Sequence, residues 1–463
     1  MPAPRYDAIV LGAGMSGLAA AIRLSQYDRR VLLLERHALV GGLNSWFKRG
    51  GRRFDTGLHA LTNYAPRNAP GAPLTKILRQ LRLSWDELRL APQTRSEIVF
   101  PSERLSFSNE FGLLESEVAR AFPGSRAGFA RLVADVRAAD PFDPHAPFAS
   151  ARARLAGLGL DAELAEMLLM PVLWYGSALA EDCAWDDFVI LFRSIFLEGF
   201  ARPEGGIKTL LDLLVARCKD AGVELRLNTP VVRIRVEGGS ARGVELEGGE
   251  TLECEQLYSS AGWLETRALA GAPVPAEQRG WVTLFELMCL TRTPHRARGH
   301  EAAITFFSQS ERPRWRPPGE LVEFESGVVC CSDNYATREA PRDGLLRATL
   351  LADHDRWSAL APEDYEAAKH SVGARLEELC ARYVPDPRPE TTLRDAFTPR
   401  TIRHYTAHAG GAVYGSPVRH RDGSSGIANL YLIGNDQGLV GVTGALLSGI
   451  TMANRHGLYA RSA

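Results

Sequence analysis

The sequence contains few cysteines and none with a metal-binding or redox spacing. Seven cysteines occur among 463 residues, an odd number, and no Cys-x-x-Cys pair is present. This pattern argues against a disulfide framework and against a zinc site built from clustered thiolates. We therefore expect reduced thiols packed in the core and no bound metal.

Long apolar runs and an excess of charge are also missing. No segment reaches the ~20 apolar residues that a membrane-spanning helix requires. The 54 basic and 55 acidic residues give a net charge of −1, so no overall field attracts nucleic acid. The first apolar strand begins at Tyr6, which leaves no room for a signal peptide. We expect a cytoplasmic protein with no nucleic-acid partner and at most peripheral contact with a membrane.

The N-terminal segment has the pattern of a nucleotide-binding βαβ unit. An apolar run leads into Gly12-Ala-Gly14-Met-Ser-Gly17, a small-residue helix follows, and Glu35 closes the next apolar run 21 residues beyond Gly14. The first glycine permits a tight turn, the second lets backbone amides approach a pyrophosphate, and the third allows close helix–strand packing. A carboxylate at the end of the second strand accepts hydrogen bonds from a ribose. The segment therefore predicts a dinucleotide site.

Motifs after this unit indicate which family the chain resembles. Gly41-Gly42 follows Glu35, and Phe54-Asp55-Thr-Gly57-Leu-His59 comes next. With these blocks the sequence resembles the phytoene desaturase and carotenoid isomerase family, within the wider flavin amine oxidase superfamily. The resemblance continues in Arg202-Pro-Glu-Gly-Gly206-Ile, Val231-Val-Arg-Ile, Ser332-Asp333, Ala340-Pro341, Phe397-Thr-Pro399, Tyr405 and Leu430-Tyr-Leu-Ile-Gly434.

The C-terminal block departs from the commonest family pattern. Asn435 follows Gly434 where the family usually has aspartate, and Asp436 comes only afterwards. Leu439-Val440 replaces the usual Pro-Gly before the Gly441-Val442 pair. The resemblance still implies binding of FAD, but it leaves open which of these side chains holds the ribityl chain.

The resemblance implies that two distant parts of the chain hold FAD. The first unit and the Gly41 loop would hold the ADP half and part of the flavin half, and the C-terminal block would hold the rest. A second strand–glycine–helix unit for NAD(P)H is absent from the sequence, so electrons are expected to leave to a quinone, oxygen or another lipid-phase acceptor, unless turnover is redox-neutral. The expected cofactor-binding residues are Gly12, Gly14, Met15, Ser16, Gly17, Glu35, Arg36, Gly41, Gly42, Leu43, Gly57, His59, Val232, Gly434, Asn435, Asp436, Gly441, Val442 and Thr443.

The expected fold class is α/β, with three interleaved parts. Residues 1–65, 201–262 and 396–463 are expected to form a Rossmann-like FAD-binding domain. Residues 66–200 have helical spacing and predict a helical insertion on the substrate or membrane side. Residues 263–395 contain strand candidates separated by turn residues, which predicts a mainly antiparallel substrate-binding domain.

Two residues are candidate catalytic groups. His59 lies, by family resemblance, beside the flavin, and a histidine can donate or accept a proton near neutral pH; the alternative is that it only fixes its loop. Tyr405 belongs to a polar cluster with Arg403, His404 and His408, which forms either part of a substrate channel or an ordinary surface loop.

A stripe of aromatic residues runs through the end of the insertion. Its members recur at a spacing of four residues and are Phe188, Phe192, Phe196 and Phe200. Such a stripe is more often core than the wall of a tunnel for a long apolar substrate. We therefore predict that these side chains are packed in the core.

The function that these observations favour is FAD-dependent oxidoreduction at carbon–carbon bonds of a hydrophobic isoprenoid or polyene-like substrate. Desaturation, saturation and cis–trans isomerisation remain open. One alternative is a flavin amine oxidase or protoporphyrinogen-type oxidase. Another is a non-catalytic prenyl-binding escort protein of the same fold, against which the intact FAD motifs at both ends argue.

Overall fold

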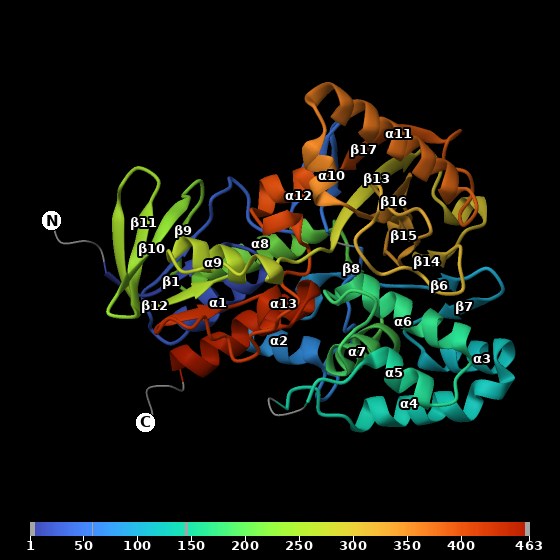
Figure 1. Cartoon of the computed structure of the whole chain (residues 1–463), viewed down its shortest axis with the longest axis horizontal. Coiled ribbons are helices and arrows are strands. Elements are labelled where there is room, and N and C mark those ends of the chain that lie inside the picture. The colour runs from blue at the N-terminus through green and yellow to red at the C-terminus, as the bar shows by residue number, and fades with distance from the viewer. Residues whose placement is uncertain (1–4, 58, 144–146, 459–463) are drawn as a thin grey trace.

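The computed structural model describes residues 5–57, 59–143 and 147–458. The chain forms a Rossmann-like sheet, a second and mainly antiparallel sheet, and a group of helices (Figure 1). In Figure 1 the first sheet lies at the left, the second at the upper right, and the helical group below the second. This arrangement confirms the predicted α/β fold class.

The first sheet is built around the strand that precedes the glycine turn. In spatial order its strands are β10 (Val231–Glu237), β11 (Ser240–Leu246), β12 (Thr251–Ser259), β1 (Arg5–Leu11), β2 (Val31–Leu34) and β9 (Glu224–Arg226), with β18 (Leu430–Leu432) beside β12. The central pairs are parallel and the β10–β11 hairpin is antiparallel. Strands buried on both faces are apolar, and β2 is buried at every residue.

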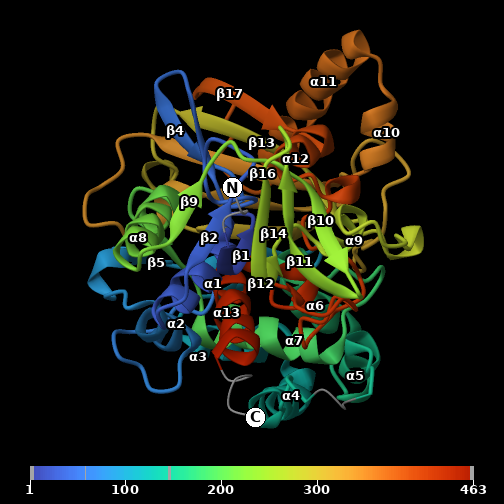
Figure 2. The same cartoon turned by 90° about the vertical axis from the view of Figure 1, so that its left-hand side faces the viewer.

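Three helices cover this sheet and join the two ends of the chain. They are α1 (Met15–Ser25), α8 (Ile207–Asp220) and α13 (Gly441–Met452). Helix α1 packs against both α8 and α13, and Figures 1 and 2 show α1 beside α13. The terminal helix starts at Gly441, so the glycine-rich segment is itself the first helical turn.

The second sheet contains strands from three regions of the sequence. In spatial order they are β17 (Thr391–Phe397), β13 (Thr283–Thr291), β16 (Gly344–Ala352), β15 (Ser326–Cys331), β14 (Ile304–Ser308), β6 (Ser96–Val99) and β7 (Arg104–Phe107). All neighbours are antiparallel except β14 and β6. Helix α11 (Pro362–Cys380) packs its apolar side chains against this sheet. The predicted mainly antiparallel sheet is thus present, and its role in binding substrate stays a prediction.

The 66–200 segment is helical as predicted, apart from short strands. Its helices are α2 (Pro73–Leu81), α3 (Phe111–Ala121), α4 (Arg126–Ala138), α5 (Ala151–Gly157), α6 (Ala162–Gly176) and α7 (Trp185–Phe192). The β6–β7 hairpin was not predicted, and it extends the second sheet through β14. Alternation of buried and less buried residues in β7 is the strand pattern that the helical reading overlooked.

Shorter elements complete the chain. They are β3 (Trp46–Arg49), β4 (Arg52–Asp55), β5 (Leu90–Pro92), β8 (Ala201–Pro203), α9 (Trp263–Leu269), α10 (His354–Ala359) and α12 (Pro399–Thr406). The aromatic stripe that ends with Phe200 is buried in the core of the helical group, as predicted. The seven cysteines are free and buried. In the described part of the chain, no helix has both the length and the apolar character needed to cross a membrane.

Candidate functional site

The glycine turn between β1 and α1 has the geometry that its sequence predicts. Gly12 has a φ of +89°, a conformation that side-chain-bearing residues rarely adopt. A Cβ at Gly17 would lie 1.9 Å from the Gly12 carbonyl oxygen, so only glycine fits there. Helix α1 begins at Met15 after the N-cap residue Gly14, which has no side chain to cap it, and its first turn contains no acidic residue. Its first amides are therefore oriented to receive an anion.

Glu35 ties the end of β2 to this turn. Its side chain is buried, and its carboxylate accepts hydrogen bonds from the backbone amides of Ala13, at 2.8 Å, and His37, at 3.0 Å. A carboxylate has about four acceptor positions, so capacity for ribose hydroxyls remains. The carboxylate lies beside the glycine turn because the parallel pairing of β1 and β2 puts their ends at one sheet edge.

The Gly41 loop and the Gly57 turn pack together next to the glycine turn. The amide of Gly41 donates to the Ala13 carbonyl at 2.8 Å. Gly41 and Gly42 have φ values of +118° and +58°. A Cβ at Gly57 would lie 2.5 Å from the Leu43 carbonyl oxygen. These glycines allow two backbone segments to approach each other more closely than side chains would permit.

A buried ion pair connects two of the family motifs. The Asp55 carboxylate accepts a hydrogen bond from the Arg202 guanidinium. Gly206 has a φ of +77°, and a Cβ there would lie 2.4 Å from an Asp55 carboxylate oxygen. The Phe-Asp-Thr-Gly and Arg-Pro-Glu-Gly-Gly blocks are therefore two sides of one contact.

The C-terminal block packs directly on α1. The Gly434 amide donates to the Ser448 hydroxyl at 2.8 Å, and a Cβ at Gly449 would lie 2.1 Å from the Ser16 carbonyl oxygen. Thr443, in the first turn of α13, donates its hydroxyl to the Thr62 carbonyl at 3.0 Å. The expected residues Met15, Ser16 and Val442 are buried along this contact. Two predicted halves of the site thus come together.

Asn435 and Asp436 are engaged by protein groups. The Asp436 carboxylate accepts from the amides of Trp263 and Ser416, and the Asn435 side-chain amide donates to the Val413 carbonyl at 2.8 Å. Both side chains therefore hold neighbouring loops in place. Asp436 is buried, whereas a carboxylate available to a ligand would be exposed.

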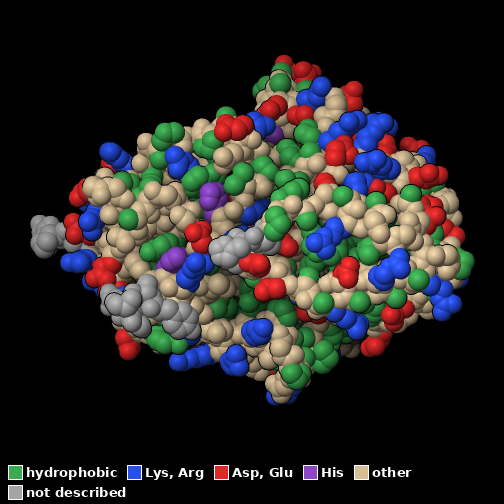
Figure 3. All heavy atoms as spheres, turned by 60° about the horizontal axis from the view of Figure 1, so that its bottom comes forward, with side chains coloured by type: hydrophobic (Ala, Val, Ile, Leu, Met, Phe, Trp, Pro, Cys, Tyr) green, Lys and Arg blue, Asp and Glu red, His purple; other side chains and the backbone are tan. Residues whose placement is uncertain are grey.

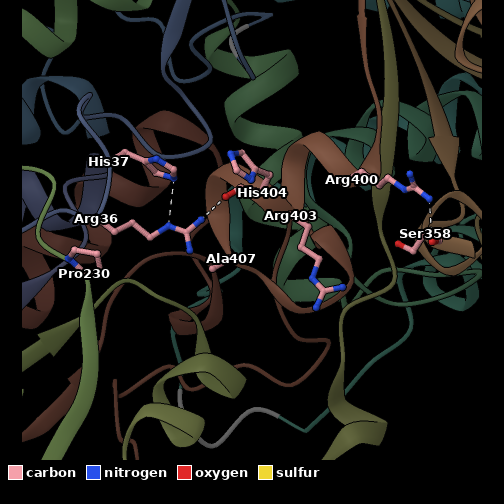
Figure 4. Close-up of a pocket in the computed structure, with 8 residues that line it drawn as sticks. All are labelled: Arg36, His37, Pro230, Ser358, Arg400, Arg403, His404 and Ala407. Carbon is pink, nitrogen blue, oxygen red and sulfur yellow. Dashed lines mark hydrogen bonds between the residues drawn. The ribbon is translucent and has the colours of Figure 1, made fainter. Parts of the chain in front are cut away.

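A basic pocket lies at the far end of the site (Figure 4). It has a volume of about 690 Å³, and its lining residues are Arg36, His37, Pro230, Ser358, Arg400, Arg403, His404 and Ala407. The Arg36 guanidinium donates to the His404 carbonyl at the end of α12. None of these described lining residues is an aspartate or glutamate and three are arginines, so the lining is cationic. Val232, which is 49% exposed, follows Pro230 at an irregularity in the β10–β11 pairing.

The two predicted catalytic residues lie in different environments. Tyr405 is 57% exposed on α12, and its carbonyl oxygen hydrogen-bonds the His37 ring at 2.8 Å. His59 instead contacts the second sheet, with its Nε2 3.0 Å from Glu286 Oε2 on β13 and 3.3 Å from Thr349 Oγ1 on β16. The structure therefore does not bring His59 and Tyr405 together.

The His59 environment contains charged residues that the sequence analysis did not single out. Arg347 donates its Nε to Glu286 Oε1 at 2.6 Å, and both side chains are at most 2% exposed. Burial by itself raises the pKa of the Glu286 carboxyl, but Arg347 and His59 outweigh burial and lower that pKa to about 2. Burial lowers the pKa of His59, and Glu286 opposes this only in part. Glu286 and Arg347 each stand within a mainly apolar strand. A charged residue in such a strand is unusual, so the sequence alone could have identified both as candidates.

Comparison with known proteins agrees with this arrangement. Residues 15–455 match the family described as flavin containing amine oxidoreductase. The prolycopene isomerase of Arabidopsis thaliana is 22% identical over 504 residues, covering 97% of this chain and 82% of that protein. The all-trans-zeta-carotene desaturase of Myxococcus xanthus is 27% identical over 300 residues, covering 58% of this chain and 55% of that protein.

Solved structures show the same fold. An oxidoreductase from Methanosarcina mazei superposes with a TM-score of 0.66 at 18% identity, covering 96% of this chain and 99% of that one. The family match runs from Met15, the first residue of α1, through the C-terminal glycine-rich block. The protein therefore belongs to the flavin-containing amine oxidoreductase family.

Proposed function

We propose that the protein is an FAD-dependent enzyme that desaturates, saturates or isomerises carbon–carbon bonds of a hydrophobic isoprenoid or polyene substrate. Its relatives named prolycopene isomerase and zeta-carotene desaturase support this substrate class. Membership of the family implies a flavin cofactor, and we propose that this flavin is FAD. The Rossmann-like unit has the acidic residue and the turn of backbone amides that bind an adenine dinucleotide.

The residues of the site fit this cofactor. Both α1 and α13 begin without a side-chain cap and without an acidic residue in the first turn, so their amides would receive the pyrophosphate and the flavin end. Glu35 would accept the ribose hydroxyls, and Arg36 and Val232 would flank the adenosine. The Gly41 loop would lie along the middle of the dinucleotide.

The protein's own contribution to chemistry would be positioning and proton transfer. Bound flavin supplies a two-electron acceptor or donor, so few side chains are essential. His59 follows Gly57 by two residues and contacts Glu286 and Thr349 of the second sheet, and it is the residue that we propose for proton transfer. A quinone or oxygen would reoxidise the flavin after desaturation, whereas isomerisation would need no net acceptor.

The observation that carries the proposal is the packing of the first βαβ unit against the C-terminal block at Gly449 and Ser16. The test is to purify the protein, record its visible spectrum and identify the flavin released on denaturation. Anaerobic incubation with poly-cis and all-trans carotenoids, with chromatography of the products, would then follow. FAD and conversion of a polyene are the expected results. A colourless protein would refute the proposal, and turnover of amines alone would favour the amine oxidase alternative.

We also propose that the enzyme contacts a membrane peripherally through the helical insertion. Phe142 and Phe148, in the loop between α4 and α5, are 58% and 71% exposed. Figure 3 brings the lower side of the molecule forward and shows hydrophobic side chains dispersed among charged ones over this face. Exposed aromatic side chains of this kind insert into the interfacial region of a bilayer. A lipid-soluble substrate would then reach the protein from the membrane.

A further inference from the structure

His59 is one end of a buried chain of polar groups that spans two strands of the second sheet. Glu286 on β13 receives hydrogen bonds at both oxygens: Arg347 Nε lies 2.6 Å from Oε1, and Thr349 Oγ1 lies 3.1 Å from Oε2. His59 Nε2 lies 3.0 Å from the same Oε2. The guanidinium and the hydroxyl come from β16, which pairs with β13. The carboxylate is therefore held by two groups of β16 in addition to its contact with His59.

This geometry determines which nitrogen of His59 carries the proton. An ionised carboxylate can only accept hydrogen bonds, and Glu286 is ionised because its pKa is about 2. The contact at Nε2 therefore requires an Nε2–H group, which leaves Nδ1 of the neutral ring with its lone pair. Among the described residues, no hydrogen bond involves His59 Nδ1. Nδ1 is then free to accept a proton.

The charges around His59 favour the neutral ring. The groups that face it are Glu286 on β13, Arg347 and Thr349 on β16, Arg202 on β8, Cys330 on β15, and Tyr335 after β15. Burial is the largest influence and lowers the pKa of His59, and the two arginines lower it further. Glu286 raises this pKa but does not overcome burial. The ring is thus uncharged at neutral pH and able to act as a base.

We propose that Glu286, held by Arg347, is a positioning residue that fixes neutral His59 as the base of a desaturation reaction. This inference rests on the proposed function and specifies its direction. The substrate loses two hydrogens from adjacent carbons. Bound oxidised flavin would supply the acceptor for one of them as a hydride, and His59 Nδ1 would accept the other as a proton. The electron pair of the second C–H bond becomes the new C=C bond, and the imidazolium that forms is stabilised by Glu286.

The first test uses the unsubstituted protein and needs no substrate. The protein is labelled with ¹⁵N-histidine, and the His59 signals are assigned by their loss in His59→Asn. The nitrogen shifts report which ring nitrogen is protonated. We expect a neutral ring protonated at Nε2 at pH 7, with a titration midpoint below the ordinary histidine pKa of about 6.5. A ring protonated at Nδ1, or a charged ring at pH 7, would overturn the proposal.

The second test compares two buried carboxylates, one on strand β13 and one on helix α11, which packs against the same sheet. Glu286→Gln removes the charge beside His59, and its amide no longer dictates the tautomer. Glu377→Gln is the matched control, because Glu377 is also buried and pairs with Arg394 at 2.7 Å but does not contact His59. We expect Glu286→Gln to keep its flavin, to lower kcat by about 10²-fold, and to shift the acidic limb of the pH–kcat profile to lower pH. The control should retain the parental profile.

Equal kcat and equal pH profiles in the two variants would refute the role of Glu286. If Glu286→Gln does not fold because Arg347 is left without its carboxylate, Glu286→Gln/Arg347→Met removes both charges, and the same comparison is made with it. Absence of flavin, or of polyene turnover, in the unsubstituted protein would instead count against the proposed function. The measurement of the His59 tautomer tests the role of Glu286 even if no flavin or polyene turnover is found.

Discussion

Replacement of Gly449 by alanine tests whether the two ends of the chain are joined as tightly as the structure indicates. Gly449 lies within α13, and a Cβ there would be 2.1 Å from the Ser16 carbonyl oxygen and 3.0 Å from the Ala20 amide nitrogen of α1. Both neighbours are backbone atoms, which cannot rotate away as a side chain can. The two helices would therefore have to move apart by roughly 1 Å to restore ordinary contact.

The expected effect is a net loss of stability. In an unconstrained helix, alanine is better than glycine by about 0.8–1.0 kcal/mol. Overpacking a tight contact costs about 1–3 kcal/mol, and a contact against rigid backbone belongs at the upper end of that range. The free energy of unfolding should therefore fall by about 1–2 kcal/mol. Flavin retention should fall as well, because separation of α1 and α13 displaces the two amide turns that are proposed to hold the cofactor.

Urea unfolding and flavin content of the same sample are the two measurements. Gly112→Ala is the matched control, because Gly112 is also helical, in α3, and no atom lies within 4 Å of a Cβ placed there. The control should be stabilised by up to about 1 kcal/mol, with unchanged flavin content. If Gly449→Ala also stabilises the protein, α1 and α13 do not pack as closely as the structure indicates.

Two further predictions concern cofactor and membrane. Glu35→Gln removes a charged acceptor proposed for the ribose and should weaken FAD binding about 10- to 100-fold, measured by fluorescence titration of the apoprotein; unchanged affinity would contradict the assignment. Phe142→Asp/Phe148→Asp should reduce co-sedimentation with liposomes while kcat on detergent-dispersed substrate is retained, and Val274→Asp, at a residue 45% exposed and outside the insertion, should sediment as the parent does. Equal sedimentation of all three proteins would argue against the membrane contact.

Local sequence was sufficient for the elements that depend on nearby residues. The β1–turn–α1–β2 unit was predicted because Gly12 needs a positive φ, Gly17 has no room for a Cβ, and the next strand is continuously apolar. Strand β12, which pairs with β1, was not predicted. Its first half alternates polar and apolar residues, a pattern typical of an edge strand rather than of a strand at the centre of a parallel sheet. The β6–β7 hairpin was missed for a related reason: four-residue strands inside a helical segment carry little periodicity.

The sequence by itself determined the dinucleotide turn, the acidic residue that follows it and the family to which these motifs belong. Each depends on backbone geometry within about 20 residues or on a short motif. The tertiary structure decided which side chains meet. His59 and Glu286 are separated by 227 positions, and His59 and Thr349 by 290. Their contact follows from the pairing register of β13 and β16 and from how that sheet packs on the first domain. The spacing of residues along the sequence predicts neither of these.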